Sequence, residues 1–133
     1  MAAGTYNFTI EQGSTLDFEI AYKDANSNPI DLTGYQARMQ IKNQPGGATT
    51  YLTLSSSLDG SGTGLNLSGS AGTNPPTSGT IGVYIAAITS SLLDFNTAFY
   101  DLELVTGSGP TATVTRVIEG KINLSKEVTT GTY

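Results

Sequence analysis

Residues 35–41 read Tyr-Gln-Ala-Arg-Met-Gln-Ile, and this stretch decides the fold class. Apolar and polar side chains alternate in it without a break. Successive side chains of an extended strand point to opposite faces of a sheet, so the alternation predicts a strand with one face buried and the other in water. The segment Asn43-Gln44-Pro45-Gly46-Gly47 follows at once and supplies a turn.

The same period of two recurs along most of the chain. It predicts further strands at residues 6–11, 16–23, 52–54, 65–67, 81–85, 100–104 and 114–124. In the last of these, Val114, Ile118, Ile122 and Leu124 are expected to share one face, with a bulge or bend at Gly120. One short helical turn is expected over residues 88–95, with Ile88, Leu92, Leu93 and Phe95 on a single apolar face. Seven or eight short strands joined by connections of uneven length predict an all-β protein, a Greek-key β-sandwich.

Length sets the domain organisation. The 133 residues suffice for one domain. We expect a single β-sandwich over residues 1–124, interrupted by a flexible Ser/Gly-rich insertion at about 55–79. Residues 125–133 are expected to form a polar C-terminal tail.

Composition narrows the function. Eleven acidic residues against six basic ones give a net charge of −5. Such a surface repels phosphate backbones and anionic lipid, so we expect neither a nucleic-acid partner nor a membrane partner. The chain has no Cys and no His, which removes thiol nucleophiles, the Ser-His-Asp triad and the commonest metal ligands.

One segment resembles the start of a calcium-binding loop, with Asp24, Asn26 and Asn28 at alternate positions. Such a loop requires Gly at its sixth position and Glu at its twelfth, where this chain has Pro29 and Tyr35. Asn and Asp are also typical of tight turns, so we interpret the cluster as a hairpin turn without a metal.

Two pairs of carboxylates lie two residues apart on predicted strands, Asp17 with Glu19 and Asp101 with Glu103. Paired carboxylates can perform acid/base hydrolysis. Their phase places all four on the polar faces, however, and Arg116 and Glu119 could pair with the face that carries Asp101 and Glu103. We therefore predict no enzyme, no catalytic residues, no cofactor site, no metal site and no small-molecule substrate.

The aromatic residues suggest a third possibility, a module that stacks rings on sugars. Tyr6, Tyr22, Tyr35 and Tyr100 fall at the apolar phase of their strands, so we expect them in the core. The phases of Tyr51 and Tyr84 are ambiguous.

Three stretches carry a family resemblance. They are residues 6–20, beginning Tyr-Asn-Phe-Thr-Ile-Glu-Gln-Gly; residues 28–41, beginning Asn-Pro-Ile-Asp-Leu-Thr-Gly-Tyr; and residues 100–104 with 114–122 and 127–129, which include Tyr-Asp-Leu-Glu-Leu. Together they resemble the small immunoglobulin-like β-sandwich proteins of tailed bacteriophage virions, and the N-terminal domain of phage baseplate upper proteins looks similar. In this motif Leu32 would plug the end of the sandwich, Gly34 would permit a turn with positive φ, and Tyr100 would be the ring of the penultimate strand.

The resemblance implies an immunoglobulin-like sandwich and a structural role. We expect a tail, baseplate or fibre-adaptor protein that is made in the host cytoplasm, resides in the virion, and contacts copies of itself and other virion proteins. The alternatives are a capsid decoration (cement) protein and a module that binds host glycans.

Overall fold

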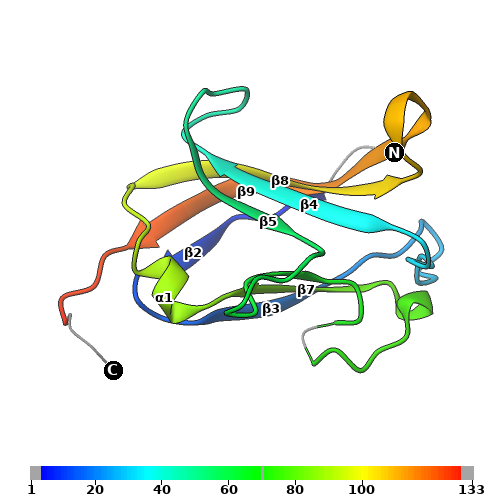
Figure 1. Ribbon diagram of the computed structural model, residues 1–133, viewed down its shortest axis with the longest axis horizontal. Helices are drawn as coiled ribbons and strands as arrows, with labels where there is room; N and C mark the ends of the chain where they lie inside the picture. The colour runs from blue at the N-terminus through cyan, green and yellow to red at the C-terminus, as the bar shows by residue number, and fades with distance from the viewer. Residues whose placement is uncertain (1–3, 70, 130–133) are drawn as a thin grey trace.

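The computed structural model describes residues 4–69 and 71–129, and within these ranges nine strands form two sheets. The larger sheet contains β1 (Gly4–Thr5), β2 (Phe8–Glu11), β4 (Gln36–Lys42), β5 (Thr50–Ser55), β8 (Thr97–Thr106) and β9 (Thr113–Ser125). The smaller sheet contains β3 (Leu16–Ala21), β6 (Gly64–Asn66) and β7 (Thr80–Ile85). The sheets lie as two layers (Figure 1), so the prediction of a two-layered all-β fold is confirmed. The predicted number of strands is too small, because the N-terminal run is divided into β1 and β2.

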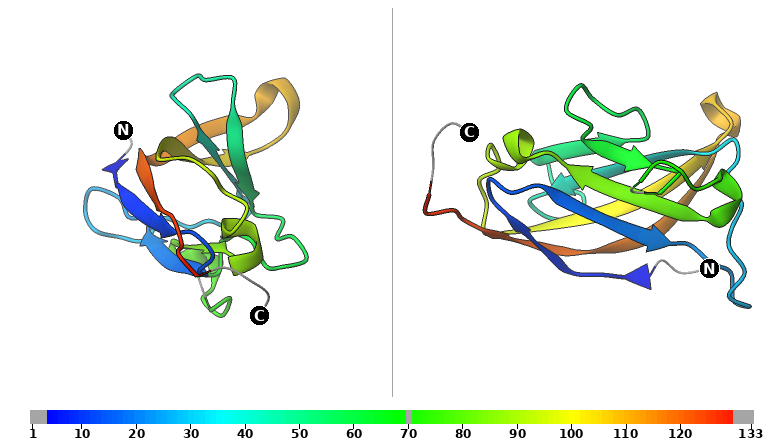
Figure 2. Two further views of the ribbon diagram at one scale, coloured as in Figure 1. Left: turned by 90° about the vertical axis from the view of Figure 1, so that its left-hand side faces the viewer. Right: turned by 90° about the horizontal axis from the view of Figure 1, so that it is seen from below.

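The strand order of the larger sheet is β1-β9-β8-β4-β5, with β2 also pairing with β9, and that of the smaller sheet is β3-β7-β6. β1 and β2 run parallel to β9, whereas all other pairings are antiparallel. Figure 2 shows the N-terminal strands beside the C-terminal strand β9. The first and last parts of the chain are therefore joined by a backbone ladder.

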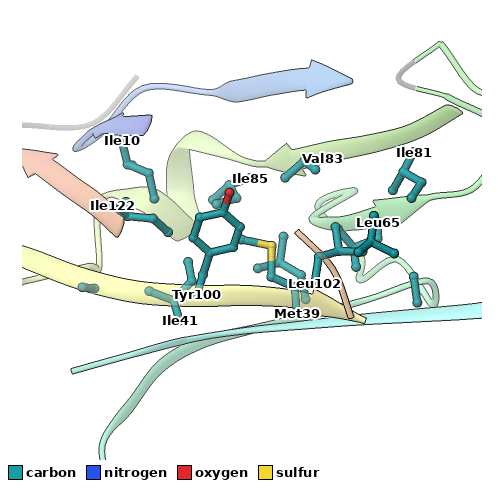
Figure 3. Close-up of a cluster of buried hydrophobic side chains, with 14 of the residues drawn as sticks. Ile10, Met39, Ile41, Leu65, Ile81, Val83, Ile85, Tyr100, Leu102 and Ile122 are labelled. Atoms are coloured by element: carbon teal, nitrogen blue, oxygen red, sulfur yellow. The ribbon is translucent and has the colours of Figure 1, made fainter. Parts of the chain in front are cut away.

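The core fills the space between the two sheets. Figure 3 shows side chains of β4 and β8, such as Met39 and Leu102, pointing toward Val83 and Ile85 of β7. Leu102 is 0% exposed, and burying a side chain of this size contributes about 1.5–3 kcal/mol. The predicted inward phases of β4 and β8 are confirmed.

The predicted helix at residues 88–95 is wrong in extent and in its apolar face. The α-helix α1 spans only Ala87–Ser90, and the chain then leads through a turn toward β8. Leu93 and Phe95 are buried, whereas Ile88 and Leu92 are 64% and 81% exposed. The four residues do not share a face because only the first of them lies in helical geometry.

The predicted phase of the last strand is correct for Ile118, Ile122 and Leu124, which pack in or against the core, and is wrong at Val114. Leu102 lies opposite Ile118, but the next residue of β8, Glu103, lies opposite Arg116, so Val117 is an extra residue in β9. Such a bulge reverses the alternation, and Val117 is buried while Val114 is 45% exposed. Gly120 is not the bulge, because it pairs in register with Tyr100.

The Ser/Gly-rich segment 55–79 contributes a strand to the smaller sheet. It contains β6, which lies at the edge of the smaller sheet, and the short 3-10 helix η1 (Pro76–Ser78). Leu65 of β6 is fully buried. A second 3-10 helix, η2 (Gly109–Thr111), lies in the β8–β9 hairpin.

The predicted C-terminal tail begins with residues that contact the sandwich. The Lys126 Nζ lies 3.1 Å from Asp94 Oδ1, and the Glu127 N–H donates to Gln12 Oε1 at 3.1 Å. The remainder of the predicted tail, residues 130–133, lies outside the described residues.

Candidate functional site

The solvent-facing side of the larger sheet, called here the outer face, carries three rows of side chains across β4, β8 and β9. The register of these strands defines a lysine row (Lys42, Phe99, Lys121), a carboxylate row (Gln40, Asp101, Glu119) and an arginine row (Arg38, Glu103, Arg116). Residues two apart on a strand lie about 6.5 Å apart, which sets the spacing between neighbouring rows.

A groove of about 550 Å³ lies over these rows. Its wall at one side is the β4–β5 loop, represented by Gln44, Pro45 and Gly46, and Thr5 and Asn7 line it near β9. In Figure 1 this loop and the β8–β9 hairpin both rise from the larger sheet, on the side away from the smaller one. The groove has the volume of a site for a small molecule or a short oligomer.

Two arginines pair with the three carboxylates of the groove. The Arg38 Nε lies 2.7 Å from Glu103 Oε1, and the Arg116 guanidinium lies 3.4 Å from both Asp101 Oδ2 and Glu119 Oε2. The predicted pairing of Arg116 and Glu119 with this face is confirmed. Because the arginine side chains are half exposed, each pair contributes only about 0–1 kcal/mol.

Asp101 occupies the centre of this arrangement. It points away from the core, as predicted, but it is half-buried. Burial, followed by the charge of Glu103, raises the pKa of the Asp101 carboxyl above its usual value, and the nearby Arg116 only partly opposes this. Among the described residues Asp101 makes one ion pair, with Arg116, while the Arg38 guanidinium pairs with the neighbouring Glu103.

The lysine row differs from its neighbours. In the part of the chain that the structure describes, neither Lys42 nor Lys121 has a carboxylate within ion-pair distance. The Lys121 ammonium lies 5.7 Å from the centre of the Phe99 ring, which is the geometry of a cation–π contact. At this end of the groove, Lys42 and Lys121 therefore lie on the two strands that flank Phe99.

The charges of the chain are distributed unequally. The outer face has four of the six basic residues and three of the eleven acidic ones, a net charge of +1. The rest of the chain carries two basic and eight acidic residues, a net charge of −6. The net charge of −5 is therefore not spread evenly, and the outer face carries a small positive charge.

The other predicted candidates lie elsewhere. Asp17 and Glu19 are exposed on β3, in the other layer, so the two carboxylate pairs do not meet. The Asp24 Oδ1 accepts hydrogen bonds from the N–H groups of Asn26 and Asn28 at 2.9 and 3.0 Å, which confirms the predicted turn. Among the described residues, no group of three or more His, Cys, Asp or Glu side chains is arranged to hold a metal ion.

The prediction that four tyrosines are buried is correct only for Tyr100, which is 6% exposed. Its hydroxyl donates to the Tyr6 carbonyl oxygen at 2.6 Å. Tyr22 and Tyr35 are half-buried, and Tyr6 is 45% exposed because its ring covers Phe8 at the edge of the sandwich, with centroids 5.8 Å apart. The two residues of ambiguous phase, Tyr51 and Tyr84, are both half-buried.

Sequence reasoning missed the lysine row. The sequence does indicate that Phe99 lies on the outer face, because it precedes the inward-facing Tyr100 on the same strand. The alignment of Lys42 and Lys121 with it depends on the register across three strands, which the sequence does not display.

Comparison of the sequence with protein-family models and with curated proteins finds no match. No helix among the described residues is long and apolar enough to cross a membrane.

Proposed function

We propose that this protein is a non-enzymatic structural component of a tailed-phage virion, in the tail, baseplate or fibre adaptor, and that its sandwich is immunoglobulin-like. It would act through protein–protein contacts in a symmetric assembly. The proposal starts from the sequence resemblance, and the following features of the structure support it.

The strand order supports the finer fold assignment. If β3 to β9 are taken as strands B, C, C′, D, E, F and G, the larger sheet contains the order C′-C-F-G and the smaller sheet the order B-E-D. This order matches part of the variable-type immunoglobulin arrangement, in which the G-F-C sheet is extended by C′ and C″; a C″ strand is not found among the described residues.

The motif that carries the resemblance has the local structure expected for it. Leu32 is 1% exposed and belongs to the core, and Gly34 has φ of 81°, a conformation that favours glycine. Tyr100 lies buried in β8, the penultimate strand. Leu32, Gly34 and Tyr100 are thus structural residues of the sandwich.

The observation that carries the assembly role is the set of open sheet edges. Within the described residues, β5 pairs only with β4, β3 only with β7, and β6 only with β7. Unpaired N–H and C=O groups along a strand can pair with a strand of a neighbouring molecule. Ile88 and Leu92 add apolar surface at one end of the sandwich.

The arrangement of ionisable groups favours a role without catalysis. The three carboxylates of the groove are paired with arginines, and the chain has no His or Cys to serve as base or nucleophile.

Immunogold labelling of particles of the phage that encodes this protein tests the proposal. An antibody against the recombinant protein should label tails or baseplates at several copies per particle. Labelling of heads would instead identify a capsid decoration protein. Protein present only in the soluble fraction of infected cells would contradict a virion role.

A further inference from the structure

The lysine row has properties that the assembly role does not use. Lys42 and Lys121 lie two strands apart, a backbone separation of about 9.5 Å, and Phe99 lies between them. An acidic protein offers many carboxylates for pairing, yet these two ammonium groups contact none among the described residues. Lys42 is also half-buried and lines the groove.

The groups around the lysine row select for hydroxyls. Gln40 and Gln44 line the groove with amides, which both donate and accept hydrogen bonds. Asn7 is fixed on the rim, because its Oδ1 accepts the Lys121 backbone N–H at 2.8 Å. The ring of Phe99 adds an apolar, electron-rich surface against which the C–H groups of a sugar can pack.

We propose that the groove is a binding site for an acidic oligosaccharide. A sugar carboxylate or phosphate would lie between Lys42 and Lys121, with its ring against Phe99. The hydroxyls of the same or the next sugar would reach the amides and the carboxylate row. This inference goes beyond the proposed virion role and does not depend on it.

The alternation of cations and carboxylates favours a ligand with one acid group over a polyanion. One row away from the lysines, about 6.5 Å along the strands, Asp101 and Glu119 present negative charge. A nucleic acid or polyphosphate would place a second anionic group beside these two carboxylates, which share a single arginine, Arg116. A sugar with one acid group and several hydroxyls satisfies both rows, because the carboxylates accept hydrogen bonds from hydroxyls.

A second copy of the chain is the competing occupant, since its surface outside the outer face is acidic. The hollow shape favours the sugar, because two sheet faces stack through flat surfaces and would leave the groove unfilled. The experiment therefore measures self-association as well as sugar binding.

The test is a ¹⁵N–¹H NMR titration of the whole chain. The acidic probes are 3′-sialyllactose and glucose 6-phosphate, which each carry one acid group, and the references are maltotriose, which is neutral, and inorganic phosphate, which lacks a sugar. The test variant is Lys42→Gln/Lys121→Gln, and the matched control is Lys23→Gln/Lys126→Gln, which removes the two basic residues outside the outer face.

We expect at least one acidic probe to bind saturably with Kd of about 1 mM or below, with shifts centred on β4, β8 and β9. The Lys42→Gln/Lys121→Gln variant should bind it about tenfold or more weakly, while the control variant should bind within about twofold of wild type. Maltotriose and inorganic phosphate should each bind at least about tenfold more weakly than the acidic sugar.

Three results would overturn the proposal. One is the absence of saturable binding by every acidic probe at about 20 mM, well above the expected Kd. Another is inorganic phosphate binding as tightly as the sugars, which would reduce the site to a simple cation pair. The third is concentration-dependent dimerisation that disappears in Lys42→Gln/Lys121→Gln but not in the control, which would assign the groove to a second copy. Unchanged melting temperatures of both variants would show that the comparison is between folded proteins.

Discussion

Substitution of Gly120 by alanine tests how the N-terminal segment is held against β9. The backbone at Gly120 is not in the positive-φ region, so alanine carries no conformational penalty there. A methyl group at this position, however, would overlap the carbonyl oxygen of Tyr6. The carbonyl group is part of the backbone and cannot rotate aside as a side chain could. Residues 6 and 7, which link β1 to β2, would therefore have to move away from β9.

The cost of that movement can be worked out from the contacts it breaks. They are the Tyr6 N–H to the Glu119 carbonyl at 2.9 Å, the Tyr100 hydroxyl to the Tyr6 carbonyl at 2.6 Å, and the Lys121 N–H to Asn7 Oδ1 at 2.8 Å. At about 1 kcal/mol net for each hydrogen bond, the loss is about 3 kcal/mol. Alanine restricts the unfolded chain and returns about 0.4–1 kcal/mol, so we expect Gly120→Ala to lower the free energy of unfolding by about 2 kcal/mol.

Urea denaturation followed by circular dichroism measures this quantity, provided that the m-value is unchanged. Gly60→Ala is the matched control, because a methyl group there has no neighbour within 4 Å and its φ is not positive. We expect the control to lie within about 0.5 kcal/mol of wild type. A Gly120→Ala protein equally close to wild type would refute the reasoning, since the N-terminal segment could then not be packed against β9 as described.

Three further predictions concern the core and the outer face. Leu102→Ala should cost about 2–5 kcal/mol because it leaves a cavity, whereas Val114→Ala, on the solvent side of the bulge, should cost under about 0.5 kcal/mol; equal costs by urea denaturation would mean that the faces are assigned wrongly. Burial raises the pKa of the Tyr100 phenol above its usual 10.0, so the folded state keeps a proton that the unfolded state releases. The free energy of unfolding should therefore fall as the pH rises beyond about 10. A fall of the same size in Tyr100→Phe would contradict this assignment. Burial likewise raises the pKa of the Asp101 carboxyl above 3.8, so the stabilisation of the folded state by the protonated carboxyl is present below that pH and is lost as the pH rises through the folded pKa. Asp101→Asn should therefore be at least as stable as wild type at neutral pH. A loss of more than about 1 kcal/mol in the free energy of unfolding would show that the ion pair of Asp101 with Arg116 dominates.

The strands were the most predictable part of the fold. The alternation at residues 35–41 predicts β4 closely, because each inward residue from Ala37 to Ile41 is apolar and each outward residue is polar. Local side-chain order decides the phase of such a strand, and no distant contact has to be known.

Predictions failed where tertiary contacts override the local pattern. The bulge at Val117 depends on how β9 pairs with β8, and no turn residue marks it in the sequence. The apolar residues Ile88 and Leu92 suggested a buried helical face, but α1 ends after one turn and leaves both in solvent. The sequence marks Gly120 as an unusual residue within a strand. It does not show why glycine is needed there, which is the close approach of the backbone at Tyr6.

Only part of the candidate site could be predicted from the sequence. The polar phase of Asp101 and Glu103 and the pairing of Arg116 with Asp101 follow from local alternation and charge. The groove does not, because it requires the register of three strands and the position of the β4–β5 loop. Residues that are distant in sequence, such as Lys42 and Lys121, become neighbours only after the sheet has formed.

The parallel ladder between β2 and β9 has a mechanical consequence. Phe8, at the start of β2, pairs with Ile122, and Glu11, at its end, pairs with Ser125. Tension applied through the two ends of the chain would pull β2 backward and β9 forward, so the strands would slide along each other. We expect the bonds of this ladder to share the load and rupture together, at a higher force than if they opened one at a time, as they would in an antiparallel hairpin pulled from its open end.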